Sequence, residues 1–175
     1  MLTLLLGGAR SGKSALAVEM GRRHRGPVVF VATSPTSVDD DMDERIARHR
    51  AERPDWPTME EPLELAAALD RADDAFVIVD CLTLWVSNLV GRGDGDDEIE
   101  KVSACAIASA TRRSAATIVV SNEVGLGVHP ETSLGLRYRD LLGRVNQQWA
   151  RAADTTMFLV AGRAVRLEDP WTFVG

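Results

Sequence analysis

Cysteine, aromatic residues and basic charge are all scarce in this sequence of 175 residues. Its two cysteines, Cys81 and Cys105, form no CxxC pair and have no histidine close by in sequence. A disulfide framework and a zinc site are therefore both unsupported. This cysteine usage favours a reducing compartment, and we expect a cytoplasmic protein.

The charge balance argues against two classes of partner. Lys and Arg number 20 against 26 Asp and Glu, so the net charge is −6, and the isoelectric point is about 5.1. Nucleic acids and anionic membranes are bound through clustered cations that release counterions, and the sequence has no basic block. We expect no nucleic-acid partner.

Long hydrophobic runs are also missing. The apolar start Met1–Leu6 lacks a basic flank and ends at Gly7 and Gly8, and no later apolar run is longer. Such a segment is too short for a signal-peptide core or a membrane span. We expect a soluble protein.

What is present is an ordinary globular composition, in which short apolar runs alternate with longer helical stretches. Apolar residues make up 45% and charged residues 26%, and the length suits one domain over residues 1–175. Continuous β-branched runs between helices predict an α/β fold of three layers, with a mostly parallel sheet covered on both faces. The predicted strands are Leu2–Leu6, Val28–Ala32, Phe76–Val79, Thr117–Val120, Thr155–Ala161 and Val165–Leu167, and the predicted helices are Ser14–Arg25, Asp40–Arg53, Pro62–Ala72, Leu82–Val90, Glu98–Arg113 and Leu134–Ala153.

The stretch Gly91–Asp97 is predicted to be a mobile loop, because glycine and like charges both oppose order. Its aspartates suggest calcium, but an EF-hand loop needs glycine at its sixth position, where Ile99 stands. A solvated loop is the better interpretation.

A glycine-rich segment follows the first predicted strand and opens the first predicted helix. Residues 7–14 read GGARSGKS, which fits the Walker A pattern G-x-x-x-x-G-K-[ST]. Glycine lets successive N–H groups face phosphate oxygens, and the helix N-terminus adds partial positive charge. In this P-loop, Lys13 would reach the β- and γ-phosphates and the Ser14 hydroxyl would complete a Mg²⁺ shell. The segment predicts binding of a nucleoside triphosphate.

A second acidic position is expected to hold the metal. Four apolar residues end in Asp80, which is the form of a Walker B strand. The carboxyl end of a buried strand is also where open α/β sheets bind ligands. Asp80 equally fits a cap for the next helix, through Leu82 or Thr83, and the two roles are compatible.

One of the three histidines stands out. His49 lies on a predicted helix with Arg45 and Arg53 one turn to either side. Neighbouring cations disfavour the imidazolium, so the ring stays neutral and able to attack, while guanidinium groups hold phosphates. A solvated surface helix, in which Glu44 and Glu52 pair the arginines, explains the same pattern and is the commoner case.

Other positions carry weaker signals. Asn122 and Glu123 follow a predicted strand, where Glu123 suits a base or a metal ligand and Asn122 suits a turn. Three arginines of the last long helix fit substrate phosphates, a neighbouring subunit or a solvated face, and two tryptophans fit a core or an interface. These residues are Arg137, Arg139 and Arg144, and Trp85 and Trp149.

Together these segments resemble one family, the bifunctional adenosylcobinamide kinase / adenosylcobinamide-phosphate guanylyltransferases of cobalamin biosynthesis. The resemblance runs in order through nearly the whole chain, although the end, Glu168–Gly175, and the stretch Val128–Glu131 depart from the pattern. The matching segments are Gly7–Ser14, Ala32–Ser34, Arg45–Arg50, Arg53–Pro54, Val79–Thr83, Val120–Gly127, Tyr138–Asp140 and Gly143–Gln147.

The resemblance implies two activities. In the first, ATP or GTP phosphorylates the aminopropanol hydroxyl of adenosylcobinamide. In the second, GTP transfers GMP to a histidine with loss of pyrophosphate, and adenosylcobinamide phosphate takes the GMP to give adenosylcobinamide-GDP. The nucleotidylated histidine of the family falls on His49, and its P–N bond would be labile once the nitrogen is protonated.

The resemblance also implies site residues and an assembly. The family forms a propeller-like homotrimer with a RecA-like sheet and with sites between subunits. Glu60 would accept from the N1–H and N2–H₂ groups of guanine, which distinguishes guanine from adenine. The implied catalytic residues are His49 and Lys13, Ser14 and Asp80 would hold Mg²⁺, and nucleotide contacts map to Gly7, Gly8, Ala9, Arg10, Ser11, Gly12, Lys13, Ser14, Ala32, Thr33, Ser34, His49, Arg50, Ala51, Glu52, Glu60, Asp80 and Cys81.

Three other functions stay open on the residues alone. A small-molecule kinase would use only the P-loop, with His49 in a structural role. A RecA-like nucleic-acid module would need the basic arm or aromatic platform that the sequence lacks. A regulatory subunit would be stabilised by nucleotide without turnover.

Overall fold

The computed structural model describes residues 1–34 and 54–174, so the predicted helix Asp40–Arg53 lies outside the described part. Strands and helices alternate along the chain, as the apolar runs predict. The strands are β1 (Leu2–Gly7), β2 (Val28–Ala32), β3 (Thr58–Glu60), β4 (Phe76–Asp80), β5 (Thr117–Val120), β6 (Thr155–Val160) and β7 (Arg163–Leu167), and the helices are α1 (Lys13–Arg23), α3 (Leu65–Arg71), α4 (Leu82–Arg92), α5 (Asp96–Arg112), α6 (Ser133–Ala152) and the 3₁₀ turn η1 (Pro170–Phe173).

The strands form one seven-stranded sheet in the order β3-β2-β4-β5-β1-β6-β7. Every neighbouring pair from β3 to β6 is parallel, and β7 alone runs antiparallel, beside β6. Leu4 and Leu5 of β1 are both completely buried although they point to opposite faces, as a strand covered on both sides requires. The predicted mostly parallel sheet is confirmed.

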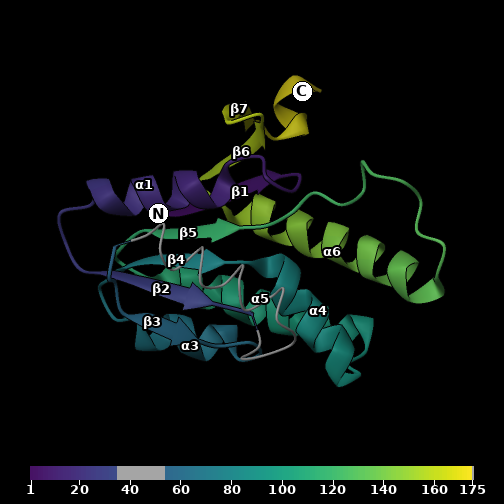
Figure 1. Ribbon diagram of the computed structural model, residues 1–175, viewed down its shortest axis with the longest axis horizontal. Helices are drawn as coiled ribbons and strands as arrows, with labels where there is room; N and C mark the ends of the chain where they lie inside the picture. Colours follow the sequence, from purple (N-terminus) through teal and green to yellow (C-terminus); the bar gives the residue numbers. More distant parts are fainter. Residues whose placement is uncertain (35–53, 175) are drawn as a thin grey trace.

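Helices cover both faces of the sheet, which gives the predicted three layers (Figure 1). On one face Leu5 and Ile78 pack with Ala17 of α1. On the other, Leu4 packs in a larger cluster to which α3, α4, α5 and α6 contribute. Trp85 and Trp149 lie in that larger cluster with no exposed surface, so both are core residues. None of the described helices is both long and apolar enough to span a bilayer.

The strand order fixes where ligands meet the sheet. β5 lies between β1, which leads into the P-loop, and β4, which ends in Asp80. One intervening strand between these two is the RecA-like arrangement. Because β1 to β6 are parallel, their carboxyl ends share one edge, the edge at which open α/β sheets bind ligands.

The predicted mobile loop Gly91–Asp97 is wrong in its extent. α4 continues to Arg92 and α5 begins at Asp96, so a short turn joins them, with Gly93 in a left-handed conformation (φ 99°). Arginines pair the like charges that argued for disorder. Arg92 pairs with Asp94 at 2.5 Å, and Arg137 donates to the Asp94 carbonyl at 2.6 Å and to Asp96 at 2.7 Å.

Two short elements escaped the sequence prediction, and both have weak apolar patterns. β3 has three residues and adds the outermost parallel strand beside β2. η1 is a single exposed turn that begins at Pro170, with Asp169 as its cap. The remaining boundaries differ from the predicted ones by a few residues at most.

Asp96 gives a test of the ordered turn. Arg137, and then Arg144, hold the pKa of the Asp96 carboxyl below its usual value of 3.8. Stability from this pairing is therefore present above that unfolded value and is lost as pH falls through the lower folded value. We expect Asp96→Asn to lower the free energy of unfolding by about 1 kcal/mol at neutral pH, allowing for solvent screening.

Urea unfolding at neutral and at strongly acid pH measures this loss, which should vanish once Asp96 is protonated. Asp97→Asn is the matched control, because Asp97 lies in the same first turn of α5. Equal losses in the two variants would attribute the effect to the helix dipole and not to the arginines.

Candidate functional site

The P-loop joins β1 to α1, as predicted. Its backbone takes left-handed values at Arg10 (φ 55°) and Gly12 (φ 100°), and α1 begins at Lys13. Gly7 leaves no room for a side chain, since an added Cβ would overlap the Leu159 carbonyl oxygen and lie 2.8 Å from the Ser11 hydroxyl. The curled backbone therefore depends on glycine at Gly7 for space and at Gly12 for conformation.

Lys13 is folded into the loop that precedes it. Only 6% of the residue is exposed, and its ammonium donates to the Gly8 carbonyl at 2.7 Å and to the Ser11 hydroxyl at 3.3 Å. Burial lowers the pKa of Lys13, and the neighbouring carboxylate of Asp80 opposes that shift. A buried cation enclosed by backbone is poised to take phosphate oxygens as partners.

The strands on either side of β1 support the loop. Beyond β5, the Glu123 N–H donates to the Gly7 carbonyl at 3.1 Å, and between β6 and β7 the Gly162 N–H donates to the Ser11 carbonyl at 3.0 Å. A Cβ at Gly12 would lie 3.3 Å from the Cα of Gly162. The turn at Gly162 thus contacts the loop directly, although nothing in the sequence around it indicated such a role.

Asp80 lies at the carboxyl end of β4, where its register neighbours are Ala32 of β2 and Val120 of β5. Its charge acts on Lys13, so the two predicted phosphate-site groups are electrostatically coupled. Cys81, and not Asp80, occupies the N-cap position of α4. Asp80 therefore lies one residue before the cap position of this helix.

Cys81 is not a reactive cysteine. Burial raises the pKa of its thiol to about 11, so it stays protonated at neutral pH and is not a nucleophile. Its main-chain groups are both bound by Thr33, whose hydroxyl accepts from the Cys81 N–H at 2.8 Å and donates to the Cys81 carbonyl at 2.7 Å.

The oxygen donors at this edge fit Mg²⁺. Ser14 offers a hydroxyl beside the phosphate cradle, and Asp80 offers carboxylate oxygens coupled to the same cradle. Hard oxygen ligands are those that Mg²⁺ prefers, and it usually takes one or two protein ligands together with substrate phosphates. No group of three or more His, Cys, Asp or Glu side chains that could hold a metal ion occurs within residues 1–34 and 54–174.

The structure brings most of the predicted nucleotide contacts to one edge of the sheet. Ala32, at the end of β2, lies in register with both Glu60 of β3 and Asp80 of β4, and Thr33 and Ser34 follow it directly. The P-loop rises from β1 in the same sheet. His49, Arg50, Ala51 and Glu52 lie outside the described residues.

Polar side chains of α4 and α6 form hydrogen bonds with the chain at this edge of the sheet. These contacts were not predicted from the sequence. Asn146 accepts from the Ser121 hydroxyl at 2.7 Å and donates to the Asn122 carbonyl at 3.0 Å, while the Asn122 N–H donates to the Thr83 hydroxyl at 2.8 Å. Tyr138, whose pKa is raised by burial, donates its hydroxyl to the Thr83 carbonyl at 2.9 Å. A polar residue on an otherwise apolar helix face, such as Asn146 next to Val145, was the available signal.

Two other residues that the sequence suggested for the site, Glu123 and Arg144, form hydrogen bonds or ion pairs within the fold. The Glu123 carboxylate accepts from the Gly125 N–H at 2.6 Å, which forms a turn. Arg144 binds Glu100 at 2.5 Å and Asp96 at 2.7 Å, so it joins α6 to α5.

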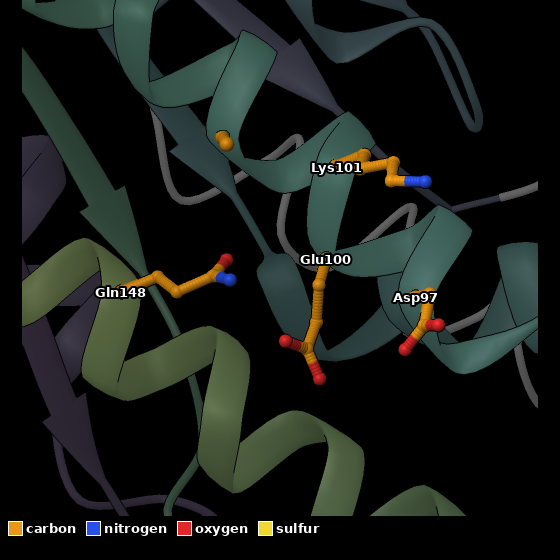
Figure 2. Close-up of a pocket in the computed structure, with 5 residues that line it drawn as sticks. Asp97, Glu100, Lys101 and Gln148 are labelled. Carbon is orange, nitrogen blue, oxygen red and sulfur yellow. The ribbon is translucent and has the colours of Figure 1, made fainter.

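A depression lies between α5 and α6 (Figure 2). Asp97, Glu100 and Lys101 of α5 line it together with Gln148 of α6. Glu100 already serves as the partner of Arg144. None of the predicted site residues lines this depression.

Gly7 gives a test of the loop geometry in the absence of nucleotide. Because an added methyl group would meet the Leu159 carbonyl, we expect Gly7→Ala to lower the free energy of unfolding by about 2 kcal/mol. Gly8→Ala is the control, since nothing lies within 4 Å of a Cβ there. Urea unfolding measures both, and equal stabilities of the two variants would contradict the close packing against β6.

Comparisons with known proteins agree with this architecture. The fold is similar to that in the crystal structure of flagellar accessory protein FlaH from Methanocaldococcus jannaschii, with a TM-score of 0.53 and 14% identity over 95% of this chain and 77% of that chain. At this identity the likeness concerns the fold alone, which is that of RecA-like P-loop proteins.

Sequence relatives are much closer. The chain is 42% identical to the bifunctional adenosylcobalamin biosynthesis protein CobP of Pseudomonas aeruginosa, over 96% of this chain and 98% of the relative. It is 36% identical to the protein called CobU in Salmonella typhimurium and in Escherichia coli, over 96% of this chain and all of each relative. Residues 3–167 match the model of the cobinamide kinase / cobinamide phosphate guanyltransferase family. The chain therefore belongs to the cobinamide kinase / cobinamide phosphate guanyltransferase family of cobalamin biosynthesis.

Proposed function

We propose that this chain, as one catalytic unit over residues 1–175, catalyses two successive reactions on adenosylcobinamide: phosphorylation, and then GMP transfer through a covalent histidine intermediate. The observation that carries the proposal is the curled P-loop, in which the buried Lys13 ammonium donates to the Gly8 carbonyl at 2.7 Å and to the Ser11 hydroxyl at 3.3 Å. Asp80 ends β4, which is separated from β1 by β5 alone. Family membership supplies the substrate class. ATP and GTP are the nucleotide substrates.

In the kinase step the P-loop holds the triphosphate and orients its γ-phosphorus. The aminopropanol hydroxyl of adenosylcobinamide attacks that phosphorus, and its proton is released to solvent. A new P–O bond forms, and the bond to the bridging β-oxygen breaks, which releases the nucleoside diphosphate. Lys13 donates to the β- and γ-phosphate oxygens, and Mg²⁺ held by Ser14 and Asp80 supplies charge neutralisation.

In the transfer step His49 acts as the nucleophile. A neutral ring nitrogen attacks the α-phosphorus of GTP, a P–N bond forms, and the bond to pyrophosphate breaks while the ring proton stays on the other nitrogen. A phosphate oxygen of adenosylcobinamide phosphate then attacks the same phosphorus. The P–N bond breaks, neutral His49 returns, and adenosylcobinamide-GDP leaves.

Glu60 gives the nucleotide site its preference for guanine. This residue lies at the end of β3, in register with Ala32, at the edge where we expect the ligand. A carboxylate accepts from both N1–H and N2–H₂ of guanine, whereas adenine presents no such pair of donors there. Ala32, Ser34 and the segment Arg50–Glu52 complete the nucleotide contacts, whereas Thr33 between them is completely buried with its hydroxyl bound to Cys81.

The assembly and compartment follow the family. We place the active sites between the subunits of a homotrimer, so that each nucleotide meets residues of two chains. Cys81 and Cys105 are both free thiols, which suits the cytoplasm.

A labelling experiment tests the covalent step. The protein is incubated with Mg²⁺ and GTP labelled at the α-phosphate, denatured, and examined for bound label beside a His49→Ala variant. We expect label that is acid-labile, stable to alkali and absent from the variant, because a phosphoramidate hydrolyses once its nitrogen is protonated. Label retained in the variant would identify a different nucleophile, and absence of label in a folded wild-type protein would leave a plain kinase.

Base preference tests Glu60 separately. We expect Glu60→Gln to weaken GTP binding by about tenfold or more while ATP binding is unchanged, because one acceptor becomes a donor facing guanine. Glu64→Gln is the control, since Glu64 is an exposed residue that pairs with Arg92 at 3.5 Å. Isothermal titration with each nucleotide measures this, and a parallel loss for ATP and GTP would contradict a role in base recognition.

A further inference from the structure

Thr33 follows the last residue of β2 and is completely buried although it is polar. The ladder between β2 and β4 ends at the pair Ala32 and Asp80. The Thr33 N–H continues it by donating to the Asp80 carbonyl at 3.2 Å. Thr33 is therefore attached to the residue that carries the predicted metal-binding carboxylate.

The Thr33 hydroxyl also binds the next residue, Cys81. It accepts from the Cys81 N–H at 2.8 Å and donates to the Cys81 carbonyl at 2.7 Å. At Cys81 the chain leaves the sheet and enters α4, so its main-chain N–H has no strand ladder to join. The Cys81 carbonyl also accepts from the Trp85 N–H of α4 at 3.2 Å, whereas the Cys81 N–H is bound by the Thr33 hydroxyl. Three hydrogen bonds between Thr33 and the chain at Asp80 and Cys81 thus hold the backbone on the carboxyl side of Asp80.

The main-chain carbonyl of Thr33 is in turn bound by a side chain of α4. The amide of Asn88 in α4 donates to the Thr33 carbonyl at 2.8 Å and to the Pro62 carbonyl at 3.0 Å. Thr33 has no exposed surface to offer a nucleotide, and its hydroxyl hydrogen is engaged with Cys81. Its contacts suit a group that orients Asp80 and not a group that touches the ligand.

We propose that Thr33 is a positioning residue, whose hydroxyl fixes the Asp80–Cys81 backbone and thereby aims the Asp80 carboxylate at the metal of a Mg²⁺–nucleotide complex. This inference rests on the proposed function, in which Ser14 and Asp80 hold Mg²⁺. Residues that orient metal ligands typically contribute about 10–100-fold to metal affinity. Thr33 therefore acts on the Mg²⁺-dependent part of nucleotide binding, and it leaves metal-free binding unchanged.

Isothermal titration with a non-hydrolysable GTP analogue, in MgCl₂ and again in EDTA, separates the two parts. We expect Thr33→Val to reduce the gain in affinity that Mg²⁺ gives by about tenfold, with the affinity in EDTA unchanged. Thr33→Ser keeps the hydroxyl and should keep the full gain. Thr33→Cys, with a weaker donor and acceptor, should give an intermediate gain, and it stands in for Thr33→Val if that variant does not fold.

Thr117→Val is the matched control. Thr117 is also completely buried, but it lies at the start of β5, and its hydroxyl has no hydrogen-bond partner within the described residues. We expect this variant to keep the full Mg²⁺ gain.

The outcomes are distinguishable. A full Mg²⁺ gain in Thr33→Val or Thr33→Cys, or an equal loss of affinity with and without Mg²⁺, would overturn the positioning role and leave the proposed function intact. Wild-type protein that binds no nucleotide, or gains nothing from Mg²⁺, would overturn the proposed function and this inference with it.

Discussion

The curled P-loop is stable only if its backbone carbonyl groups are hydrogen-bonded. The residues that bind these carbonyls connect the loop to the rest of the site. The Lys13 ammonium binds the Gly8 carbonyl from within the loop. Two further bonds come from outside the loop. Glu123, beyond β5, donates its N–H to the Gly7 carbonyl, and Gly162, beyond β6, donates its N–H to the Ser11 carbonyl. β5 and β6 are the two strands that flank β1, so the strand order of the sheet is also the support of the loop.

The same requirement operates at the second acidic position. Asp80 ends β4, and past it the chain leaves the sheet, where buried N–H and C=O groups need partners. Thr33 supplies them for Cys81, and Asn146 and Thr83 do the same for Asn122 at the end of β5. At the carboxyl edge, the backbone groups that follow the strands are therefore hydrogen-bonded. The Asp80 carboxylate at this edge acts to raise the pKa of Lys13, against the effect of burial.

Much of this architecture could be predicted from local pattern, because buried parallel strands and the P-loop both leave continuous signals in sequence. Six strands, the three layers and the place of Asp80 were predicted correctly, whereas the three-residue strand β3 was missed. The turn after α4 was not predicted. Arg92 pairs with Asp94 within the turn, but Asp96 is paired by Arg137 and Arg144, which are distant in sequence. Asn88 and Gly162 were missed for the same reason, since each acts through a partner that only the folded chain brings near. His49 and the helix predicted to carry it lie outside the described residues, so the role of His49 stays a prediction.

We propose that one sheet edge, from the P-loop to Glu60, forms a single nucleotide site. A crystal structure of the protein with Mg²⁺ and a non-hydrolysable GTP analogue would show whether it does. We expect the triphosphate within residues 7–14, the metal bound by Ser14 and Asp80, and the guanine at Glu60. Triphosphate bound elsewhere, with Lys13 still closed onto the Gly8 carbonyl, would contradict it.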